Sequence, residues 1–378
     1  MPTDTGKTTI LALSVSAGAG HVRAAQALQA AAARYRPEVE VVHVDVMELV
    51  SKLFRKAYAD SYLKVVERHP ALWGYLYDRA DTEKVDSALN RLRIEVERLN
   101  LQKVKKTIRE VHPDHIVCTH FLPAQMLSGE VAKGKLTTPV WVQTTDYDIH
   151  SLWIHMGMAG YFAATDEVAS RIAERGVPAS TVHTTGIPIM PVFGEKLSRA
   201  DCARDLGLDP GKMTIALMSG GHGVGGIDAL VERLMELPGD FQMVALAGRN
   251  EGLLGRLKAL AAQRPGRLVP MGFTDKVERV MAASDIAVTK PGGLTTTECL
   301  AVGLPMIIVS PIPGQEERNA DFLLENGAAL KACDSSALIY RVRALLAEPA
   351  RLESLRANAK RLGRPGAARA VLDTVTGK

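Results

Sequence analysis

Three glycine-rich turns, each placed between an apolar strand and a helix, constrain the fold of this chain most strongly. They lie at 14–21, 219–226 and 290–293. Strand, tight turn and helix in succession build parallel α/β sheets, which bind ligands at the carboxyl ends of their strands. Because the turns are spread over most of the chain, we expect two α/β halves, each with its own ligand edge.

The third turn is the most specific of the three. An apolar strand at 285–288 runs into the turn at 290–293, and the helix that follows carries Glu298 one turn from its start. Free N–H groups at a helix start, reached past glycines, form an anion site suited to a diphosphate. Glu298 is placed to accept hydrogen bonds from a ribose, although a glutamate here also complements the helix dipole. The expected sugar-nucleotide site contains Gly292, Gly293, Leu294, Thr295 and Glu298.

Composition agrees with a two-domain globular protein. With 378 residues, the chain exceeds the roughly 250–300 residues at which single cores stop growing. A net charge of +4 is too small to indicate a nucleic acid partner, and we expect none. The four cysteines lie far apart without a C-x-x-C pair, which favours the reducing cytoplasm over a disulfide framework or a zinc site. We see no leader sequence and no apolar stretch of the ~20 residues that a membrane span requires.

A basic and aromatic segment at 52–77 is the candidate membrane contact. Its lysines and arginines are interleaved with apolar and aromatic residues, as in a helix that lies on an anionic membrane surface. An ordinary amphipathic helix packed on its own domain has the same pattern. The membrane or acceptor contacts expected here are Lys52, Phe54, Arg55, Lys56, Tyr58 and Tyr62.

Strands alternate with helices along the chain, which indicates two parallel sheets. In the first half, strands are predicted at 9–13, 39–44, 115–118, 139–143, 160–164 and 181–184. In the second half they are predicted at 214–218, 242–246, 267–269, 285–288 and 306–309. Helices are predicted at 24–33, 84–110, from about 227, and at 352–375 with a break at 363–366. A segment dense in proline and glycine, 186–194, separates the two series, so we place the hinge there.

Several motifs occur in an order that resembles a known enzyme family. They are Ser16-Ala17-Gly18-Ala19-Gly20-His21, Thr145-Asp146 before His150 and Trp153, Gly186-Ile187-Pro188-Ile189, Lys290-Pro291-Gly292-Gly293-Leu294-Thr295 with Glu298, and Pro313-Gly314-Gln315-Glu316 with Asn319. From Ile10 to about Gly327, the chain resembles the monogalactosyldiacylglycerol synthase and processive diacylglycerol glucosyltransferase family. It is more distantly similar to the peptidoglycan enzyme that adds N-acetylglucosamine to lipid I.

The resemblance implies a GT-B fold, glycosyltransferase family 28-like, in which two Rossmann-like domains with parallel sheets face a central cleft. It implies an inverting transfer of a hexose from UDP-glucose or UDP-galactose to a lipid acceptor, diacylglycerol first of all. It also implies no tightly bound cofactor and no metal held by an Asp-x-Asp motif, with the protein cytoplasmic and peripheral on the inner face of the cell membrane. We expect an acceptor domain at 1–190, a donor domain at 191–350, and a C-terminal helix at 351–378 that crosses back to the first domain.

The same resemblance assigns catalytic and acceptor roles. His21 matches the family's general base, which removes the proton of the acceptor hydroxyl as the bond to the anomeric carbon forms. The alternative is that His21 only orients its loop. Asp146 is expected to orient His21 or to bind a sugar hydroxyl, and its alternative is a capping role. Trp153 is expected to contact the membrane or the acceptor.

The remaining donor-site residues are matched in the same way. Gln315 and Glu316 match a pair that hydrogen-bonds hydroxyls of the donor sugar, and relatives outside the lipid branch carry a different second residue. Phe273 and Thr274 match a stretch whose backbone reads the base, and Arg249 is expected at the phosphates. The first two glycine turns add Gly20, Ser219, Gly220 and Gly221.

Two other functions fit parts of the pattern. A UDP-sugar epimerase would use the same fold without a lipid and without the segment at 52–77. An NAD-dependent oxidoreductase is indicated by Gly18-Ala19-Gly20 with Asp45 after the next strand, but Arg23 occupies the third glycine position. The donor hexose, the acceptor (a polyprenyl-type lipid included), processivity and oligomeric state stay open, because glucose and galactose differ at a single hydroxyl.

Overall fold

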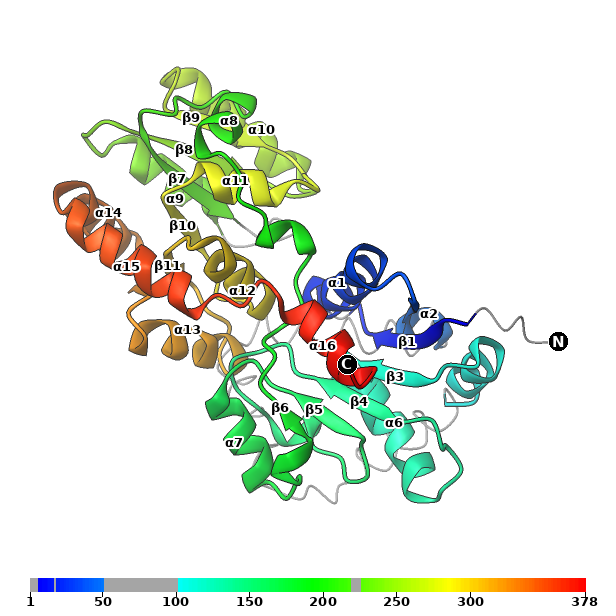
Figure 1. Ribbon diagram of the computed structural model, residues 1–378. Helices are drawn as coiled ribbons and strands as arrows, with labels where there is room; N and C mark the ends of the chain where they lie inside the picture. Colours follow the sequence, from blue (N-terminus) through cyan, green and yellow to red (C-terminus); the bar gives the residue numbers. More distant parts are fainter. Residues whose placement is uncertain (1–5, 17, 51–100, 219–225) are drawn as a thin grey trace, which may run out of the picture. The chain divides into compact units, whose positions relative to one another are not determined.

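The computed structural model describes residues 6–16, 18–50, 101–218 and 226–378, and it divides into two compact units (Figure 1). Unit 1 consists of Met1–Pro191, Pro313–Gln315 and Pro365–Lys378. Unit 2 consists of Val192–Ile312 and Glu316–Arg364. Each unit contains a six-stranded parallel sheet, so the predicted α/β class with two Rossmann-like halves is confirmed.

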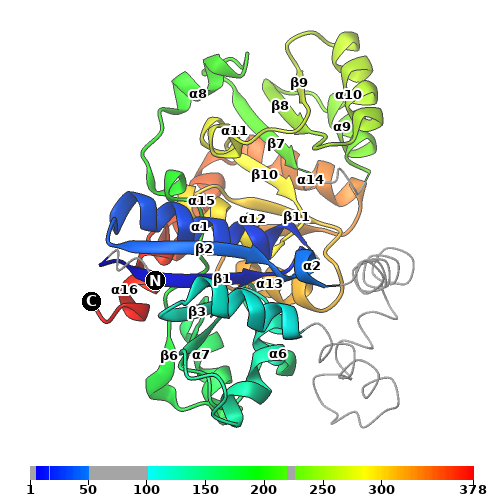
Figure 2. The ribbon, with the colours of Figure 1, turned by 90° about the vertical axis from the view of Figure 1, so that its right-hand side faces the viewer.

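Unit 1 is built on a sheet with the strand order β2-β1-β3-β4-β5-β6. Figure 2 shows β2, β1 and β3 side by side. Its strands are β1 (Thr8–Ser14), β2 (Val39–Asp45), β3 (His115–Cys118), β4 (Val140–Gln143), β5 (Gly160–Phe162) and β6 (Val182–His183). Neighbouring strands all pair in parallel. β1 is an almost continuous apolar run because both faces of the sheet are covered: Leu11 and Leu13 pack into one core, and Ile10 and Ala12 into another.

Helices cover both faces of this sheet. They include α1 (Ala19–Tyr35), α2 (Val46–Leu49), α6 (Phe121–Ala132), α7 (Asp166–Glu174) and α16 (Ala367–Val375), with 3₁₀ turns η1 (Ser151–Trp153) and η2 (Ala179–Thr181). α6 and α7 contribute to the core around Leu11, whereas α1 and α16 contribute to the core around Ile10. The buried face of α1 is mostly alanine, and these short side chains leave room for Val371 and Leu372 of α16.

Unit 2 has the strand order β12-β11-β10-β7-β8-β9. Its strands are β7 (Met213–Met218), β8 (Phe241–Leu246), β9 (Leu268–Met271), β10 (Ile286–Thr289), β11 (Met306–Val309) and β12 (Ala329–Ala332). The helical elements from the unit boundary onward are η3 (Pro191–Gly194), α8 (Arg199–Asp205), α9 (Ile227–Met235), α10 (Glu251–Gln263), α11 (Val277–Ala283), α12 (Gly293–Val302), α13 (Gln315–Glu325), α14 (Ser335–Ala347) and α15 (Pro349–Leu362). The carboxyl end of β10 therefore leads directly through the third glycine turn into α12.

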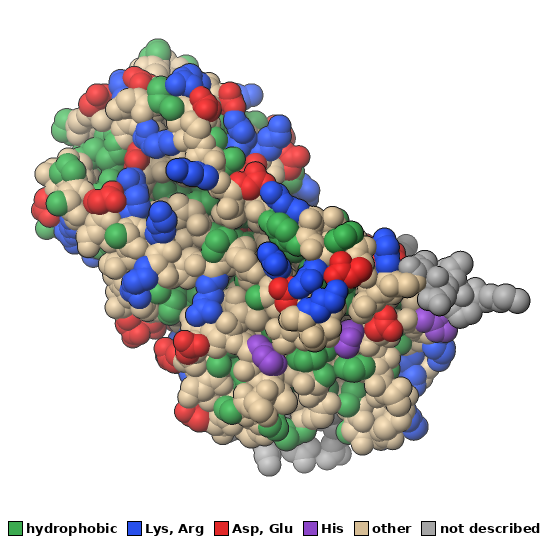
Figure 3. All heavy atoms as spheres, viewed as in Figure 1, with side chains coloured by type: hydrophobic (Ala, Val, Ile, Leu, Met, Phe, Trp, Pro, Cys, Tyr) green, Lys and Arg blue, Asp and Glu red, His purple; other side chains and the backbone are tan. Residues whose placement is uncertain are grey.

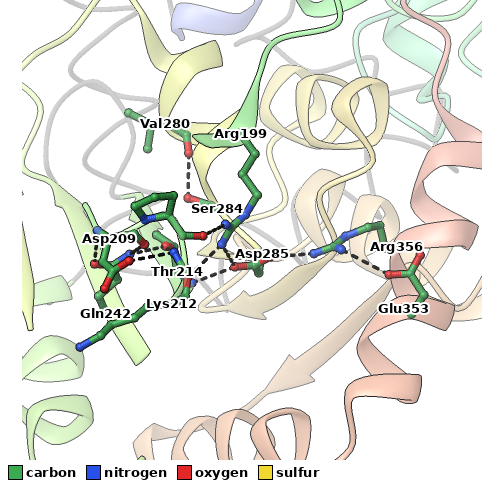
Figure 4. Close-up of polar contacts among 12 residues, drawn as sticks. Arg199, Asp209, Lys212, Thr214, Gln242, Val280, Ser284, Asp285, Glu353 and Arg356 are labelled. Atoms are coloured by element: carbon green, nitrogen blue, oxygen red, sulfur yellow. Dashed lines mark hydrogen bonds and ion pairs between the residues drawn. The ribbon is translucent and has the colours of Figure 1, made fainter. Parts of the chain in front are cut away.

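A buried carboxylate anchors the amino end of β10 (Figure 4). Asp285 accepts hydrogen bonds from Arg199 at 2.7 Å, from Arg356 at 2.9 Å and from the backbone N–H of Thr214 at 2.9 Å. Arg199 also donates to two backbone carbonyls. These contacts join α8, β7 and α15 to the strand that ends at the third glycine turn.

The strands predicted from the sequence are all present, with small shifts at their ends. β12 was not predicted, because Ala329-Leu330-Lys331-Ala332 has little β propensity and gains its place by pairing with β11. The predicted break at 363–366 is confirmed, since it separates α15 from α16. Only 365–378 of the expected crossing segment belongs to unit 1, because Leu355 of α15 packs into the core of unit 2. Of the helix predicted at 84–110, residues 101–110 are helical and the rest lies outside the described residues.

The described helices include none that is both long and apolar enough to cross a membrane. On the face seen in Figure 3, Lys and Arg side chains are interspersed with Asp and Glu. All four cysteines are free thiols, three of them buried and Cys333 exposed.

Candidate active site

His21 lies in the first turn of α1 and is held by residues that follow two other strands. Its Nδ1 atom lies 3.0 Å from the carbonyl oxygen of Thr119 and 2.9 Å from the hydroxyl of Thr145. Thr119 follows β3 and Thr145 comes shortly after β4. Because β1, β3 and β4 are neighbours in the sheet, the three residues meet at one carboxyl edge. Gly20, expected at the donor, lies one residue before His21 in the same turn of α1.

Thr119 contacts His21 twice. The Thr119 hydroxyl donates to the His21 carbonyl at 2.9 Å, and the Thr119 carbonyl faces the His21 ring nitrogen. A carbonyl oxygen only accepts, so Nδ1 carries the ring proton and Nε2 carries the lone pair. This is the tautomer in which Nε2 can act as a general base.

Two further rings lie beside His21. The ring of His120 meets it edge-on, with centroids 4.4 Å apart and an angle of 81° between the planes. The centroid of Trp153 is 6.3 Å from that of His21 and 6.1 Å from that of His120. Trp153, expected from the sequence at the membrane or the acceptor, is buried beside both histidines.

Burial governs the protonation of this cluster. It lowers the pKa of His21 below its usual value, while the Asp146 carboxylate and the bond to Thr119 partly oppose that shift. Burial, and secondarily the neighbouring His21, holds the pKa of His120 well below its usual range. Both imidazoles are therefore neutral at pH 7. Asp146 acts on His21 through its charge.

In unit 2, the third glycine turn connects β10 to α12. Gly292 is the N-cap of α12, with an extended backbone, and it offers no side-chain acceptor to the first N–H groups of the helix. Uncapped N–H groups at a helix start are suited to bind an anion. Gly293, Leu294 and Thr295 form the first turn of α12, and Glu298 is buried one turn further along.

α13 packs against the same turn. Asn319 donates a hydrogen bond to the Pro291 carbonyl at 3.0 Å. One oxygen of Glu316 accepts from the Ile312 N–H at 2.7 Å. Its other oxygen lies 3.7 Å from the point that a Cβ at Gly292 would occupy. Glu316 therefore lies beside the third glycine turn, in the first turn of α13, which begins at Gln315.

Arg249 and Phe273 form a pair on the β8-β9 side of the sheet. Arg249 follows β8 and Phe273 follows β9, and the guanidinium lies 4.5 Å from the centroid of the phenyl ring. Phe273 is 57% exposed, although a large apolar side chain is ordinarily buried. The hydroxyl of Thr274 accepts from the Lys276 N–H at 3.0 Å, so this side chain takes part in a local turn.

The remaining expected site residues lie outside the described residues. They are Ser219, Gly220, Gly221, Lys52, Phe54, Arg55, Lys56, Tyr58 and Tyr62. Within the ranges that the structure describes, no three His, Cys, Asp or Glu side chains gather in a group that could hold a metal ion.

Three residues of the His21 cluster were not assigned a role from the sequence: Thr119, His120 and Thr145. A signal was present, because all three follow closely on strands predicted at 115–118 and 139–143. The order of the strands in the sheet was needed to bring them to His21, and that order is not visible in the chain.

Solved structures with the same architecture define the class. MurG of Acinetobacter baumannii aligns with a TM-score of 0.60 and 15% identity, covering 98% of this chain and 100% of that chain. The UDP-GlcNAc 2-epimerase of Neisseria meningitidis, solved with UDP-GlcNAc, aligns with a TM-score of 0.63 and 12% identity. The alignment covers 98% of this chain and 100% of that chain. The two parallel α/β units of this chain are thus a GT-B fold, which both transferases and epimerases use.

Sequence comparison identifies the family within that class. The monogalactosyldiacylglycerol (MGDG) synthase family matches residues 21–189, and the glycosyltransferase family 28 C-terminal domain matches residues 231–371. The processive diacylglycerol beta-glucosyltransferase of Bacillus pumilus (strain SAFR-032) is 30% identical over 293 residues, 77% of this chain and 76% of that protein. The enzyme of the same name from Bacillus subtilis (strain 168) is 28% identical over 371 residues, which cover 97% of this chain and 94% of that protein. The chain belongs to the monogalactosyldiacylglycerol synthase and processive diacylglycerol glucosyltransferase family and is a hexosyltransferase.

Proposed function

We propose that the protein transfers glucose from UDP-glucose to diacylglycerol with inversion at the anomeric carbon. The observation that carries the proposal is the His21 imidazole, neutral and with its lone pair on Nε2, in a chain of this family. The names of the Bacillus relatives specify diacylglycerol and a beta-glucosyl product. A beta product from an alpha-linked UDP-sugar requires inversion.

In the proposed reaction, the acceptor hydroxyl gives its proton to Nε2 of His21 as its oxygen bonds to the anomeric carbon. The bond from that carbon to the diphosphate breaks, and its electron pair leaves with UDP. The N–H groups at the start of α12 stabilise the negative charge on the leaving diphosphate. Glu298 holds the ribose, and Glu316 with Gln315 binds the hexose.

The experiment that tests this proposal identifies the product. In separate incubations, the purified protein is mixed with diacylglycerol vesicles and one donor: UDP-glucose, UDP-galactose or UDP-GlcNAc. We expect a lipid heavier by one hexose from UDP-glucose, with a beta anomeric coupling in its proton spectrum. His21→Ala should lower turnover by roughly 10²–10⁴-fold. Transfer only from another donor, or an alpha product, would contradict the proposal.

The second candidate function is a UDP-sugar epimerase, because epimerases share this fold. The same incubations distinguish it, since an epimerase converts one UDP-sugar into another without any lipid. Family membership favours the transferase.

Action at a membrane surface is part of the proposal and is supported by the sequence at 52–77 alone. Each basic residue near an anionic surface contributes about 1 kcal/mol of attraction. We expect the protein to sediment with anionic vesicles at low salt, to release as salt rises, and to bind neutral vesicles poorly. Replacement of Lys52, Arg55 and Lys56 by glutamate should abolish sedimentation and leave UDP binding unchanged. Wild-type protein that stays in the supernatant at low salt would refute docking through this segment.

A further inference from the structure

His120 is the residue beside His21 whose hydrogen-bonding pattern is most constrained. It directly follows Thr119 and is the N-cap of α6. Its Nδ1 atom accepts a hydrogen bond from the backbone N–H of Leu122 at 3.0 Å. A ring nitrogen that accepts carries no proton, so the neutral ring of His120 carries its proton on Nε2.

His21 and His120 therefore hold opposite tautomers. His21 presents a lone pair at Nε2, because its Nδ1 donates to a carbonyl. His120 presents an N–H at Nε2, because its Nδ1 accepts from Leu122. The two rings are edge-on neighbours with centroids 4.4 Å apart. Together they offer one acceptor and one donor, which is the complement of a single hydroxyl group.

His120 is buried, with 3% of the residue's surface exposed. Its Nδ1 atom is already bonded to the Leu122 N–H, so Nε2–H is the ring group that remains to bind a ligand. A helix cap by itself does not explain the choice of histidine, because Asn, Asp, Ser and Thr cap more favourably.

We infer that His120 is a second acceptor-binding residue, which donates from Nε2 to the same substrate hydroxyl that His21 deprotonates. The inference rests on the proposed function and adds to it a residue that touches the acceptor. The hydroxyl oxygen accepts from His120 through one lone pair and attacks the anomeric carbon with the other. Its proton passes to Nε2 of His21, and the bond to the diphosphate breaks with the electron pair leaving on UDP. The N–H of His120 thus fixes the direction of the attacking lone pair.

The variant that isolates this role is His120→Asn. Asparagine is a favoured N-cap, so it replaces the capping bond to Leu122, but it has no N–H at the position of Nε2. We expect kcat/KM for dioctanoylglycerol to fall about tenfold or more, the effect of one lost hydrogen bond that aligns the reacting group. KM for UDP-glucose and the unfolding temperature should stay at the wild-type values.

The matched control exchanges a cap on another helix of unit 1. Thr165 caps α7 by accepting from the Val168 N–H at 3.2 Å, and Thr165→Asn makes the same kind of exchange there. This control should retain wild-type kinetics. Wild-type kcat/KM for dioctanoylglycerol in His120→Asn would overturn the inference and reduce His120 to a cap.

A measurement on the wild-type protein separates this inference from the proposed function. Nitrogen-15 spectra of the histidine rings report which nitrogen carries the proton. We expect opposite tautomers for His21 and His120, and a shift of the His120 Nε2 resonance when dioctanoylglycerol is added. Equal tautomers, or no shift at saturating lipid, would overturn the inference even if transfer occurs. The expected shift without transfer from any UDP-sugar would refute the proposed function and leave the acceptor contact in place.

Discussion

At the scale of single residues, the environment of His21 predicts a pH dependence. The general base acts in its neutral form, so the rate falls as pH drops through the pKa of His21. Burial lowers that pKa below the usual 6.5, and the charge of Asp146 partly opposes the shift. The acidic limb of kcat/KM should therefore have its midpoint below pH 6.5. Asp146→Asn removes the opposing charge and should move the midpoint to still lower pH.

The control for this pH profile is Glu167→Gln, which neutralises an exposed carboxylate at the start of α7. It should leave the midpoint in place. A midpoint that rises in Asp146→Asn would mean that the carboxylate does not stabilise the imidazolium of His21.

Glu298 provides a residue-scale test of the donor site. Glu298→Ala should weaken UDP binding by about 1.5–3 kcal/mol, the range for a hydrogen bond to a charged group. Titration calorimetry with UDP measures the effect, and Glu232→Ala on the exposed side of α9 is the control. Unchanged UDP affinity in Glu298→Ala would show that this residue does not bind the ribose. Its role would then be to complement the dipole of α12.

The site residues that could be predicted from the sequence are those whose local structure depends on residues nearby in the chain. His21, Gly292 and Glu298 lie in glycine turns or in the first turns of the helices that follow them, where the local geometry depends on neighbouring residues. A role for Thr119, Thr145 and His120 can be recognised only once they are known to lie beside His21. They lie there because β3 pairs with β1 and β4 pairs with β3. Such long-range pairing has no local signature in the sequence.

At the scale of elements, the Asp285 network determines how firmly β10 is held. The carboxylate is bonded to Arg199, Arg356 and the Thr214 N–H, and it is largely buried. Removing one partner of a buried ionic network leaves the others unsatisfied. Since both arginines are about one third exposed, solvent compensates in part, and Asp285→Ala should cost about 2–3 kcal/mol of stability.

Denaturant unfolding of unit 2 measures this cost. The control is Arg233→Gln, which breaks the exposed Arg233–Glu236 pair on α9 and should change stability by less than about 0.5 kcal/mol. Equal effects of the two substitutions would show that Asp285 is no more than a surface charge.

At the scale of the whole molecule, the ordered motifs were sufficient to predict two α/β halves, but not which half each C-terminal helix joins. α15 and α16 are adjacent in the chain. Leu355 packs with the core of unit 2, whereas Leu372 packs with the alanine face of α1 in unit 1. The chain changes units between Arg364 and Pro365. Just before this point, a side chain at Gly363 would overlap the Leu300 carbonyl near the end of α12.

This division predicts that two equivalent leucine substitutions act on different units. Leu372→Ala should destabilise unit 1 and Leu355→Ala unit 2, by about 2–5 kcal/mol each for a buried leucine and less where the site collapses. UDP at saturation stabilises only the unit that binds it. In a calorimetric scan, UDP should therefore raise the transition lowered by Leu355→Ala and leave the one lowered by Leu372→Ala in place. If UDP instead rescues Leu372→Ala, the nucleotide binds to unit 1, and the assignment of the donor to α12 and its glycine turn is wrong.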